Sequence, residues 1–376
     1  MSAAEARRRR VLVAMSGGVD SSVAAALLLA EGYEVVGATM QLWSSDAAAA
    51  DGTPRCCSDS DSGSARAVAS MLGFAHHSLN LRDAFREAVV RDFVDEYARG
   101  RTPNPCIRCN EHVKFDALLR RAHRLGADHL ATGHHARIVR DPLSGRYRLL
   151  RGIDRAKDQS YVLYTLTQDQ LAQVLLPVGH LTKAQVRAHA RRLGLTVAER
   201  PDSQDVCFVG RRAYARLVAN ERPDALQPGP ILDAEGNVLG EHPGIAHYTV
   251  GQRKRLGIGA GRRLYVLAID PARRAVIVGP DDRAGVAGCR VSTINWIAFD
   301  QPPRRLSAEV QIRYNSTPVA CAVTPSDTGA DVEFSEPVRG VAPGQAAVFY
   351  AGEAVLGGGT IEDRALRRCS PPVLLL

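Results

Sequence analysis

The sequence predicts an α/β protein with a doubly wound parallel sheet, followed by a small central domain and a C-terminal antiparallel β-barrel. An uncharged apolar run at 11–15 is typical of a buried parallel strand, and the run at 23–30 is rich in strong helix formers. A second strand is expected at 34–40, which completes a strand–helix–strand unit. Beyond Gly210 the chain changes to short alternating runs broken by glycine, the pattern of antiparallel sheets.

The first strand and helix are joined by a glycine- and serine-rich turn, Ser-Gly-Gly-Val-Asp-Ser at 16–21. Gly17 and Gly18 let the backbone approach a ligand closely. The N–H groups that open the helix from Val19 point outward with the positive end of the helix dipole behind them. This geometry suits an anionic phosphate. The turn has no lysine, so it is not a Walker A loop; without a ligand it would be an ordinary strand–turn–helix with a capping serine.

The rest of the first domain alternates between segments with the periodicity of helices and segments with that of strands. Glycine, serine and aspartate at 44–64 predict a mobile loop that holds Cys56 and Cys57, and two prolines predict a stiff loop at 100–110. We expect Gly100 to end a helix and Thr182 to cap one. The other expected elements are strands at 75–81, 128–132 and 147–151, and helices at 65–72, 83–97, 113–125 and 181–193.

Length and charge limit the class of protein. A chain of 376 residues predicts two or three domains, and we place the boundaries near Gly210 and Gly285. No apolar run approaches the ~18 residues that span a bilayer, and the apolar run at 11–15 is too short for a signal peptide, so we expect a cytoplasmic protein without a membrane partner. The net charge of +8 favours a polyanionic partner, although arginine-rich surfaces alone would give the same balance.

The cysteines indicate a second kind of chemistry besides phosphate binding. In a cytosolic chain the eight cysteines are unlike a structural disulfide framework, so clustered ones are candidates for redox, sulfur or metal chemistry. Cys106 and Cys109 form a C-x-x-C pair, and Cys207 lies in a polar stretch far along the chain. Cys289, Cys321 and Cys369 stand alone and are expected to be small buried or surface residues.

Several motifs together resemble the bacterial tRNA-specific 2-thiouridylase family, within the N-type ATP pyrophosphatases. They are Ser-Gly-Gly-Val-Asp-Ser at 16–21, Thr-Pro-Asn-Pro-Cys-Ile-Arg-Cys-Asn at 102–110, Thr-Gly-His at 132–134, Lys-Asp-Gln-Ser-Tyr at 157–161, Asp-Ser-Gln-Asp-Val-Cys-Phe at 202–208, Gly-Gln-Arg-Lys at 251–254, Arg-Tyr at 313–314 and Pro-Gly-Gln at 343–345. The resemblance extends through nearly the whole chain. It implies an enzyme that uses ATP and magnesium to adenylate C2 of the wobble uridine in the tRNA anticodon, and then replaces the oxygen by sulfur from a persulfide donor.

The resemblance also implies roles for individual residues. Cys207 would carry the persulfide, and Cys109 would be the second catalytic cysteine, closing a disulfide with Cys207. It implies ATP contacts for Ala14, Met15, Ser16, Gly17, Gly18, Val19, Asp20, Ser21, Met40 and Gly133, target-base contacts for Asn104, Pro105 and Cys106, tRNA contacts for Lys157, Asp158, Gln159, Arg313 and Tyr314, and accessory roles for His134 and Gln345. The domains would be an ATP-pyrophosphatase catalytic domain at 1–210, a central tRNA-contacting domain at 211–285 and a β-barrel domain at 286–376.

Three alternatives stay open. Many family members carry aspartate where this chain has Cys106, and Cys106, Cys109 and Cys207 would supply three thiolates for an iron–sulfur cluster with one open iron site. Another ATP pyrophosphatase, such as an amidating synthetase, would share the phosphate loop but has no use for paired cysteines. A non-catalytic tRNA-binding protein would explain the basic charge, but it would not need intact Ser16, Asp20, Cys109 and Cys207.

Overall fold

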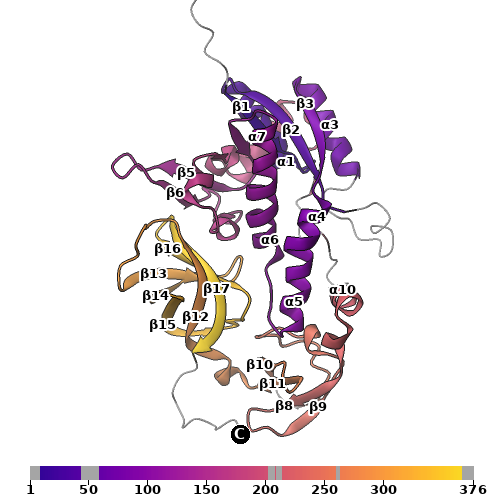
Figure 1. Cartoon of the computed structure of the whole chain (residues 1–376), viewed down its shortest axis with the longest axis vertical. Helices are drawn as coiled ribbons and strands as arrows, with labels where there is room; N and C mark the ends of the chain where they lie inside the picture. The colour runs from indigo at the N-terminus through magenta and orange to yellow at the C-terminus, as the bar shows by residue number, and fades with distance from the viewer. Residues whose placement is uncertain (1–8, 44–58, 202–207, 209–213, 260–262, 366–376) are drawn as a thin grey trace, which may run out of the picture. The chain divides into compact units, whose positions relative to one another are not determined.

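The structure is a computed structural model that describes residues 9–43, 59–201, 208, 214–259 and 263–365. The chain divides into two compact units (Figure 1). The first comprises Met1–Arg91, Pro105–Tyr214 and Glu353–Val355, and the second comprises Asp92–Asn104, Ala215–Gly352 and Leu356–Leu376. Among the described residues, no helix has the length and apolar character needed to cross a membrane.

A five-stranded parallel sheet forms the centre of the first unit, in the order β3-β2-β1-β4-β7. Its strands are β1 (Arg10–Ala14), β2 (Glu34–Gln41), β3 (Ala75–Asn80), β4 (His129–Ala131) and β7 (Val174–Leu175). Val11, Leu12 and Val13 are completely buried, as their uncharged run predicted. The predicted doubly wound sheet is therefore confirmed. Its strand order reverses between β1 and β4, and in such sheets ligands bind at that point, beyond the carboxyl ends of the strands.

Helix α1 (Val19–Ala30) follows β1 and buries Val23, Ala24, Ala25 and Leu28 in the core of this unit. Other helical segments of the unit are α3 (Asp59–Leu72), α4 (Arg82–Phe85), η1 (Arg86–Arg91), α6 (Pro105–Arg108), η2 (Cys109–Leu118), α7 (Leu119–Arg124), η3 (Ser160–Leu163), α8 (Gln168–Leu171), η4 (Pro177–His180) and α9 (Lys183–Arg192). An antiparallel hairpin, β5 (Ala136–Arg140) and β6 (Tyr147–Arg151), completes it. The expected cap at Thr182 is confirmed, because its side chain accepts from Gln185 N–H in a capping box.

Two sequence-based expectations were wrong at their edges. Helix α3 begins at Asp59, inside the stretch predicted as a loop to residue 64, because tertiary contacts of the buried Asp61 and Ser62 outweigh poor helix propensity. The predicted loop at 100–110 gives way to a helix at Pro105, since proline fits the first helical position. Residues 44–58, with Cys56 and Cys57, lie outside the described residues.

The helices expected at 83–97 and 113–125 are present, but each contains a π-helical segment, η1 and η2. Their apolar side chains still recur at threes and fours, so the sequence pattern does not distinguish a π-helix from an α-helix. Short π-helical segments are frequent at functional sites. Segment η2 begins at Cys109, one of the cysteines singled out by the sequence.

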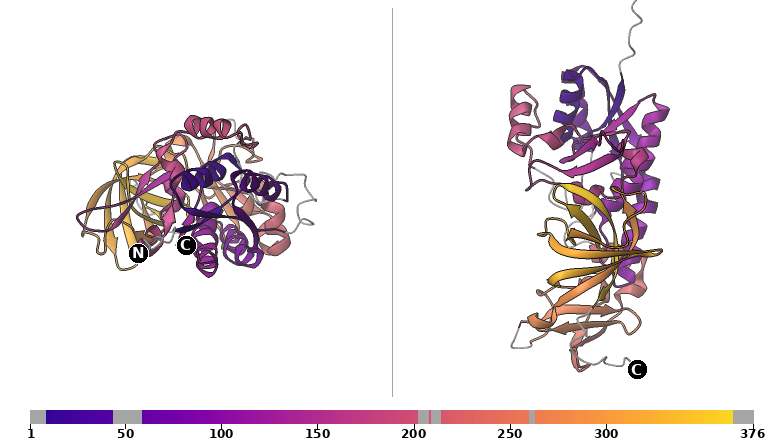
Figure 2. Two further views of the ribbon diagram at one scale, coloured as in Figure 1. Left: turned by 90° about the horizontal axis from the view of Figure 1, so that it is seen from above. Right: turned by 90° about the vertical axis from the view of Figure 1, so that its left-hand side faces the viewer.

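The second unit contains a small sheet and a closed barrel. The sheet has the order β10-β11-β8-β9, from β8 (Gly229–Leu232), β9 (Val238–His242), β10 (Tyr265–Asp270) and β11 (Ala275–Gly279). The barrel strands are β12 (Gly285–Trp296), β13 (Leu306–Gln311), β14 (Val319–Ser326), β15 (Gly329–Arg339), β16 (Ala346–Ala351) and β17 (Ala354–Ala365), coloured orange to yellow in Figure 2. Because β12 pairs antiparallel with both β15 and β17, the six strands close, which confirms the predicted barrel.

The remaining helical segments of the second unit are short. They are α5 (Asp92–Ala98), α10 (Tyr214–Glu221, whose first residue belongs to the first unit), η5 (Pro223–Leu226), η6 (Ile245–His247) and η7 (Asp281–Arg283). Gly100 follows α5 with a φ of +68°, so the predicted helix end there is confirmed.

Candidate functional site

The phosphate loop lies directly after β1 and is fastened by its own hydroxyl groups. Ser21 Oγ accepts from Ser16 N–H at 3.3 Å and donates to Gly18 O at 3.2 Å, and Ser22 Oγ donates to the same carbonyl at 2.9 Å. Gly18 is the N-cap of α1 and has no side chain to cap the helix. The N–H groups of the first turn are therefore offered to a ligand, at the positive end of the helix dipole.

Two glycines allow neighbouring parts of the backbone to pack closely around the phosphate loop. Gly17 has a φ of +69°, and a Cβ atom there would lie 2.4 Å from Asp61 O. Gly133 follows β4, where a Cβ atom would lie 2.5 Å from Ser21 N. The end of β4 thus packs directly against the start of α1, across the reversal of strand order. Gly133 and the loop, which the sequence predicted at one nucleotide site, lie next to each other.

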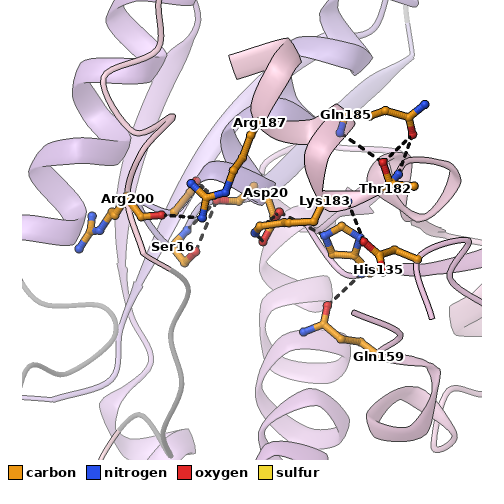
Figure 3. A network of polar contacts seen from close by, with 12 residues as sticks. Ser16, Asp20, His135, Gln159, Thr182, Lys183, Gln185, Arg187 and Arg200 are labelled. Atoms are coloured by element: carbon orange, nitrogen blue, oxygen red, sulfur yellow. Dashed lines mark hydrogen bonds and ion pairs between the residues drawn. The ribbon is translucent and has the colours of Figure 1, made fainter. Parts of the chain in front are cut away.

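The carboxylate of Asp20 is held by two residues from distant parts of the chain (Figure 3). Lys183 Nζ donates to its two oxygens at 2.8 and 2.7 Å, and His135 Nε2 lies 3.2 Å from one of them. Burial raises the pKa of Asp20, but the hydrogen bonds from His135 and Lys183 and the charge of Lys183 outweigh it, so this pKa lies below its ordinary value. Asp20 is therefore ionised at neutral pH.

The hydrogen bonding of the His135 ring follows from its surroundings. Its Nδ1 is buried without a hydrogen-bond partner among the described residues. Its Nε2 faces the Asp20 carboxylate, which only accepts, so Nε2 carries a proton and donates. The backbone N–H of His135 donates to Gln159 Oε1 at 2.9 Å, and Gln159 N–H donates to His135 O at 2.9 Å. His135 therefore joins the segment at 157–159 to the phosphate loop.

His134, an accessory candidate, is buried beside β4. Burial, the charge of Lys114 and the neighbouring His135 lower the pKa of His134 well below its ordinary value, so the ring is neutral at physiological pH. Lys114 Nζ is 3.5 Å from its Nε2, which must accept because an ammonium group only donates. The proton then lies on Nδ1 and donates to Thr132 Oγ1 at 2.6 Å.

The candidate catalytic cysteines differ in exposure. Cys109 is buried at the first position of η2, and Cys106 is exposed in α6. Asn110, next to Cys109, donates from Nδ2 to Val162 O at 2.9 Å. By contrast, burial raises the pKa of both Cys289 and Cys321 to about 12, in the core of the barrel. Both are buried, within the range that the sequence predicted for isolated cysteines.

Cys207 lies outside the described residues, but both ends of its segment are anchored. Arg200 Nη1 donates to Gly17 O at 2.9 Å and Arg200 forms an ion pair with Asp61. Phe208 stacks on Trp43 at 5.7 Å and meets Phe85 edge-on at 5.5 Å. The sequence did not single out these anchors, because each joins residues more than a hundred positions apart.

The segment at 157–159 is shaped from inside. Asp158 accepts from Arg151 Nη1 at 3.0 Å, from Gly152 N–H at 3.0 Å, and from the N–H and hydroxyl of Ser160 at 3.0 and 2.9 Å. Its side chain is 7% exposed, so its carboxylate holds the turn. Lys157 and Gln159 are half-buried.

In the second unit, Arg313 Nη2 donates to Gly340 O at 2.7 Å and to Val250 O at 3.1 Å, and the adjacent Tyr314 is 41% exposed. Gln345 Nε2 donates to Thr102 O at 2.8 Å and to Pro103 O at 3.2 Å. Gln345 therefore holds the backbone that leads to Asn104, the first of the expected target-base contacts.

Of the other predicted ATP contacts, Ala14 ends β1, Met15 is a buried core residue, Val19 opens α1, and Met40 lies near the carboxyl end of β2. Within the described residues there is no group of three or more histidine, cysteine, aspartate or glutamate side chains arranged to hold a metal. Cys207 is not one of the described residues, so the iron–sulfur alternative stays open.

Comparison with known proteins covers nearly the whole chain. Family models described as the tRNA methyl transferase HUP domain, the tRNA methyl transferase PRC-barrel domain and the aminomethyltransferase beta-barrel domain match residues 9–211, 217–280 and 286–361. The tRNA-specific 2-thiouridylase MnmA of Carboxydothermus hydrogenoformans is 49% identical over 95% of this chain and 98% of its own. Those of Geotalea uraniireducens and Geobacter metallireducens are each 50% identical over 95% of this chain, covering 96% and 98% of their own lengths. The chain belongs to the MnmA family of tRNA-specific 2-thiouridylases.

Proposed function

We propose that this protein is a tRNA 2-thiouridylase, which replaces the C2 oxygen of the wobble uridine by sulfur and cleaves ATP to AMP and pyrophosphate. The observation that carries the proposal is the 49% identity along 95% of the chain to a 2-thiouridylase that is matched over 98% of its own length. The phosphate loop at the reversal of strand order supports it, because this is where the fold binds ligands.

The C2 carbonyl of uracil is a poor electrophile, so its oxygen must first become a leaving group. The uridine oxygen attacks the α-phosphate of ATP, and a bond to AMP forms as pyrophosphate leaves. Ser16, Gly17, Gly18 and the N–H groups at the start of α1 would bind the departing pyrophosphate. Magnesium would offset its charge, and the carboxylate of Asp20, whose side chain is 30% exposed, has the oxygen ligands that this ion prefers.

Sulfur arrives from a persulfide on Cys207. Its terminal sulfur attacks C2, and AMP leaves with the original oxygen. The base is then linked to Cys207 through two sulfur atoms. The Cys109 thiolate attacks the Cys207 sulfur of this disulfide, which frees 2-thiouridine and leaves a Cys109–Cys207 disulfide for reduction by an external thiol.

Lys157, Gln159, Arg313 and Tyr314 are the proposed tRNA contacts, and Asn104, Pro105 and Cys106 the proposed base contacts. Asp158 shapes the backbone that carries Lys157 and Gln159, because its carboxylate accepts four hydrogen bonds inside this turn. We keep the three-domain division at 1–210, 211–285 and 286–376, and a cytoplasmic location, as parts of the proposal.

The test is one incubation of the protein with magnesium, ATP, a persulfide donor and unmodified tRNA, followed by mass spectrometry of the nucleosides. We expect 2-thiouridine with the wild type and none with Cys207→Ser or Cys109→Ser, while Cys289→Ser, a matched substitution in the barrel core, keeps the activity. A methylated uridine in place of the thiolated one would overturn the proposal. Iron and sulfide analysis after anaerobic purification separates the two sulfur mechanisms, because the persulfide route predicts full activity without iron.

A further inference from the structure

The phosphate loop has an electrostatic deficit. It binds a polyphosphate without the lysine of a Walker A loop, and its one ionisable side chain is a carboxylate, Asp20. An aspartate at the second position of α1 is favourable for the helix dipole, but it repels a phosphate that binds at the same helix end. The opposing positive charge must come from outside the loop.

Lys183 brings a positive charge to this place from 163 residues away in the sequence. Its Nζ lies 2.8 and 2.7 Å from the two Asp20 oxygens, and Figure 3 shows the side chain reaching from α9 to the loop. The side chain of Lys183 is only 11% exposed. A lysine this deeply buried is rare unless it is paired, and here its partner belongs to the phosphate loop itself.

Neither helix formation nor stability accounts for a lysine at this position. Lys183 is the first residue of α9, directly after the capping Thr182, where the helix dipole disfavours a cation. A buried ion pair also adds little net stability, because the cost of removing two charges from water offsets their attraction. A residue that breaks a local rule in this way is expected to be retained for function.

His135 makes a shift of the lysine feasible. It donates to Asp20 from Nε2 at 3.2 Å, so the carboxylate keeps a partner when the ammonium group turns to a bound anion. We propose that Lys183 is a phosphate-binding residue, which supplies from α9 the positive charge that the loop lacks and stabilises the pyrophosphate released from ATP. This inference rests on the proposed function, of which it specifies the ATP half.

A double-mutant cycle measured as Mg-ATP affinity without tRNA tests the proposal. The variants are Lys183→Met, Lys183→Arg, Asp20→Asn and the pair Asp20→Asn/Lys183→Met, with Arg192→Met as a control that removes an exposed cation from the same helix. We expect Lys183→Met to weaken binding by about tenfold or more, in the wild type and again in the Asp20→Asn background, because a charge-assisted hydrogen bond to phosphate is lost in both. Lys183→Arg should recover most of the affinity, and Arg192→Met should leave it unchanged.

The proposal is overturned if Lys183→Met has no effect, or if its effect vanishes once Asp20 is neutral, since Lys183 would then act only by holding Asp20. If Lys183→Met alone does not fold, the charge-balanced pair compared with Asp20→Asn gives the same answer. A wild type that thiolates tRNA, while Lys183→Met binds Mg-ATP normally, refutes this inference alone. A wild type that neither binds ATP nor thiolates tRNA refutes the proposed function.

Discussion

Two aspartates in the first unit, the buried Asp158 and the half-buried Asp20, form ion pairs but differ in which parts of the chain the pairing joins. Asp158 accepts from Arg151, Gly152 and Ser160, none more than seven residues away. Asp20 is bound by Lys183 and His135, which are 163 and 115 residues away. The Asp158 side chain is 7% exposed and that of Asp20 is 30% exposed. All hydrogen bonds given for the Asp158 carboxylate lie within one turn, whereas the Asp20 carboxylate joins distant segments beside a candidate ligand site.

The carboxylate of Asp158 therefore has a structural role, whereas that of Asp20 lies where it can act on a ligand. Three of the four Asp158 hydrogen bonds come from backbone N–H groups or a hydroxyl, which would be left without a partner if the carboxylate were lost. Asp20 is held by the side chains of Lys183 and His135. Removing both charges of a pair should therefore destabilise the fold at Asp158 and leave its stability nearly unchanged at Asp20.

The largest effect is expected at the turn. Arg151→Met/Asp158→Ala removes both charges but still leaves the N–H groups of Gly152 and Ser160 buried without an acceptor, so we expect the free energy of unfolding to fall by about 3 kcal/mol. Urea unfolding followed by circular dichroism measures it. A loss below about 1 kcal/mol would show that water or a rearranged turn satisfies these groups, and would remove the distinction between the two aspartates.

The close approach of β4 and α1 gives the second test. Gly133→Ala places a methyl group 2.5 Å from Ser21 N and 2.7 Å from Asp20 C, and the backbone there cannot yield without moving the phosphate loop. We expect about 1–3 kcal/mol of destabilisation together with weaker Mg-ATP binding. Gly63→Ala is the matched control, because a Cβ atom at this position in α3 meets nothing within 4 Å and alanine favours the helix. Equal effects of the two substitutions would contradict a tight contact between Gly133 and the start of α1.

The charge-balanced pair at the phosphate loop should be nearly neutral for stability. Asp20→Asn/Lys183→Met removes both charges and leaves His135 a carbonyl oxygen as its acceptor, so we expect the free energy of unfolding to change by less than about 1 kcal/mol. Urea unfolding measures this change as well, with Arg151→Met/Asp158→Ala measured in parallel. If this variant is destabilised as much as that one, the ion pair of Asp20 is structural.

The smallest effect is the pH dependence of stability. Because the folded-state pKa of Asp20 lies below its ordinary value of 3.8, its stabilising contribution is fully present above that value and is lost as pH falls through the folded pKa. The stability difference between the wild type and Asp20→Asn should thus be constant from neutral pH to about pH 5 and shrink below about pH 4. A difference that already shrinks between pH 7 and pH 5 would mean that a group other than Asp20 carries it.

Local patterns predicted most of the fold, and distant contacts were beyond them. The strand at 11–15, its glycine turn and helix α1 follow from short-range periodicity, and so do the alternating strands of the barrel. The π-helical segment at Cys109 was missed because an extra residue per turn leaves the apolar spacing almost unchanged. The helix start at Pro105 was missed because two nearby prolines favoured a loop, although proline also fits the first position of a helix.

The site shows the same division. The sequence singled out Asp20, Gly133 and Cys109 by motif, but it contained no sign that Lys183 or His135 bind Asp20. Lys183 follows a threonine cap at the start of a helix, and only the tertiary fold brings it to the loop. Its position, where the helix dipole disfavours a cation, was not enough to predict this contact.

The most direct test of the mechanism follows the oxygen that leaves the base. An anticodon stem-loop RNA carrying oxygen-18 at C2 of the wobble uridine is incubated with the protein, magnesium, ATP and a persulfide donor, and the AMP is analysed by mass spectrometry. Adenylation of the base places one labelled oxygen in the phosphate of each AMP, in equal amount to the 2-thiouridine formed. Unlabelled AMP formed alongside 2-thiouridine would contradict activation of the base by ATP, and with it the proposed role of the phosphate loop.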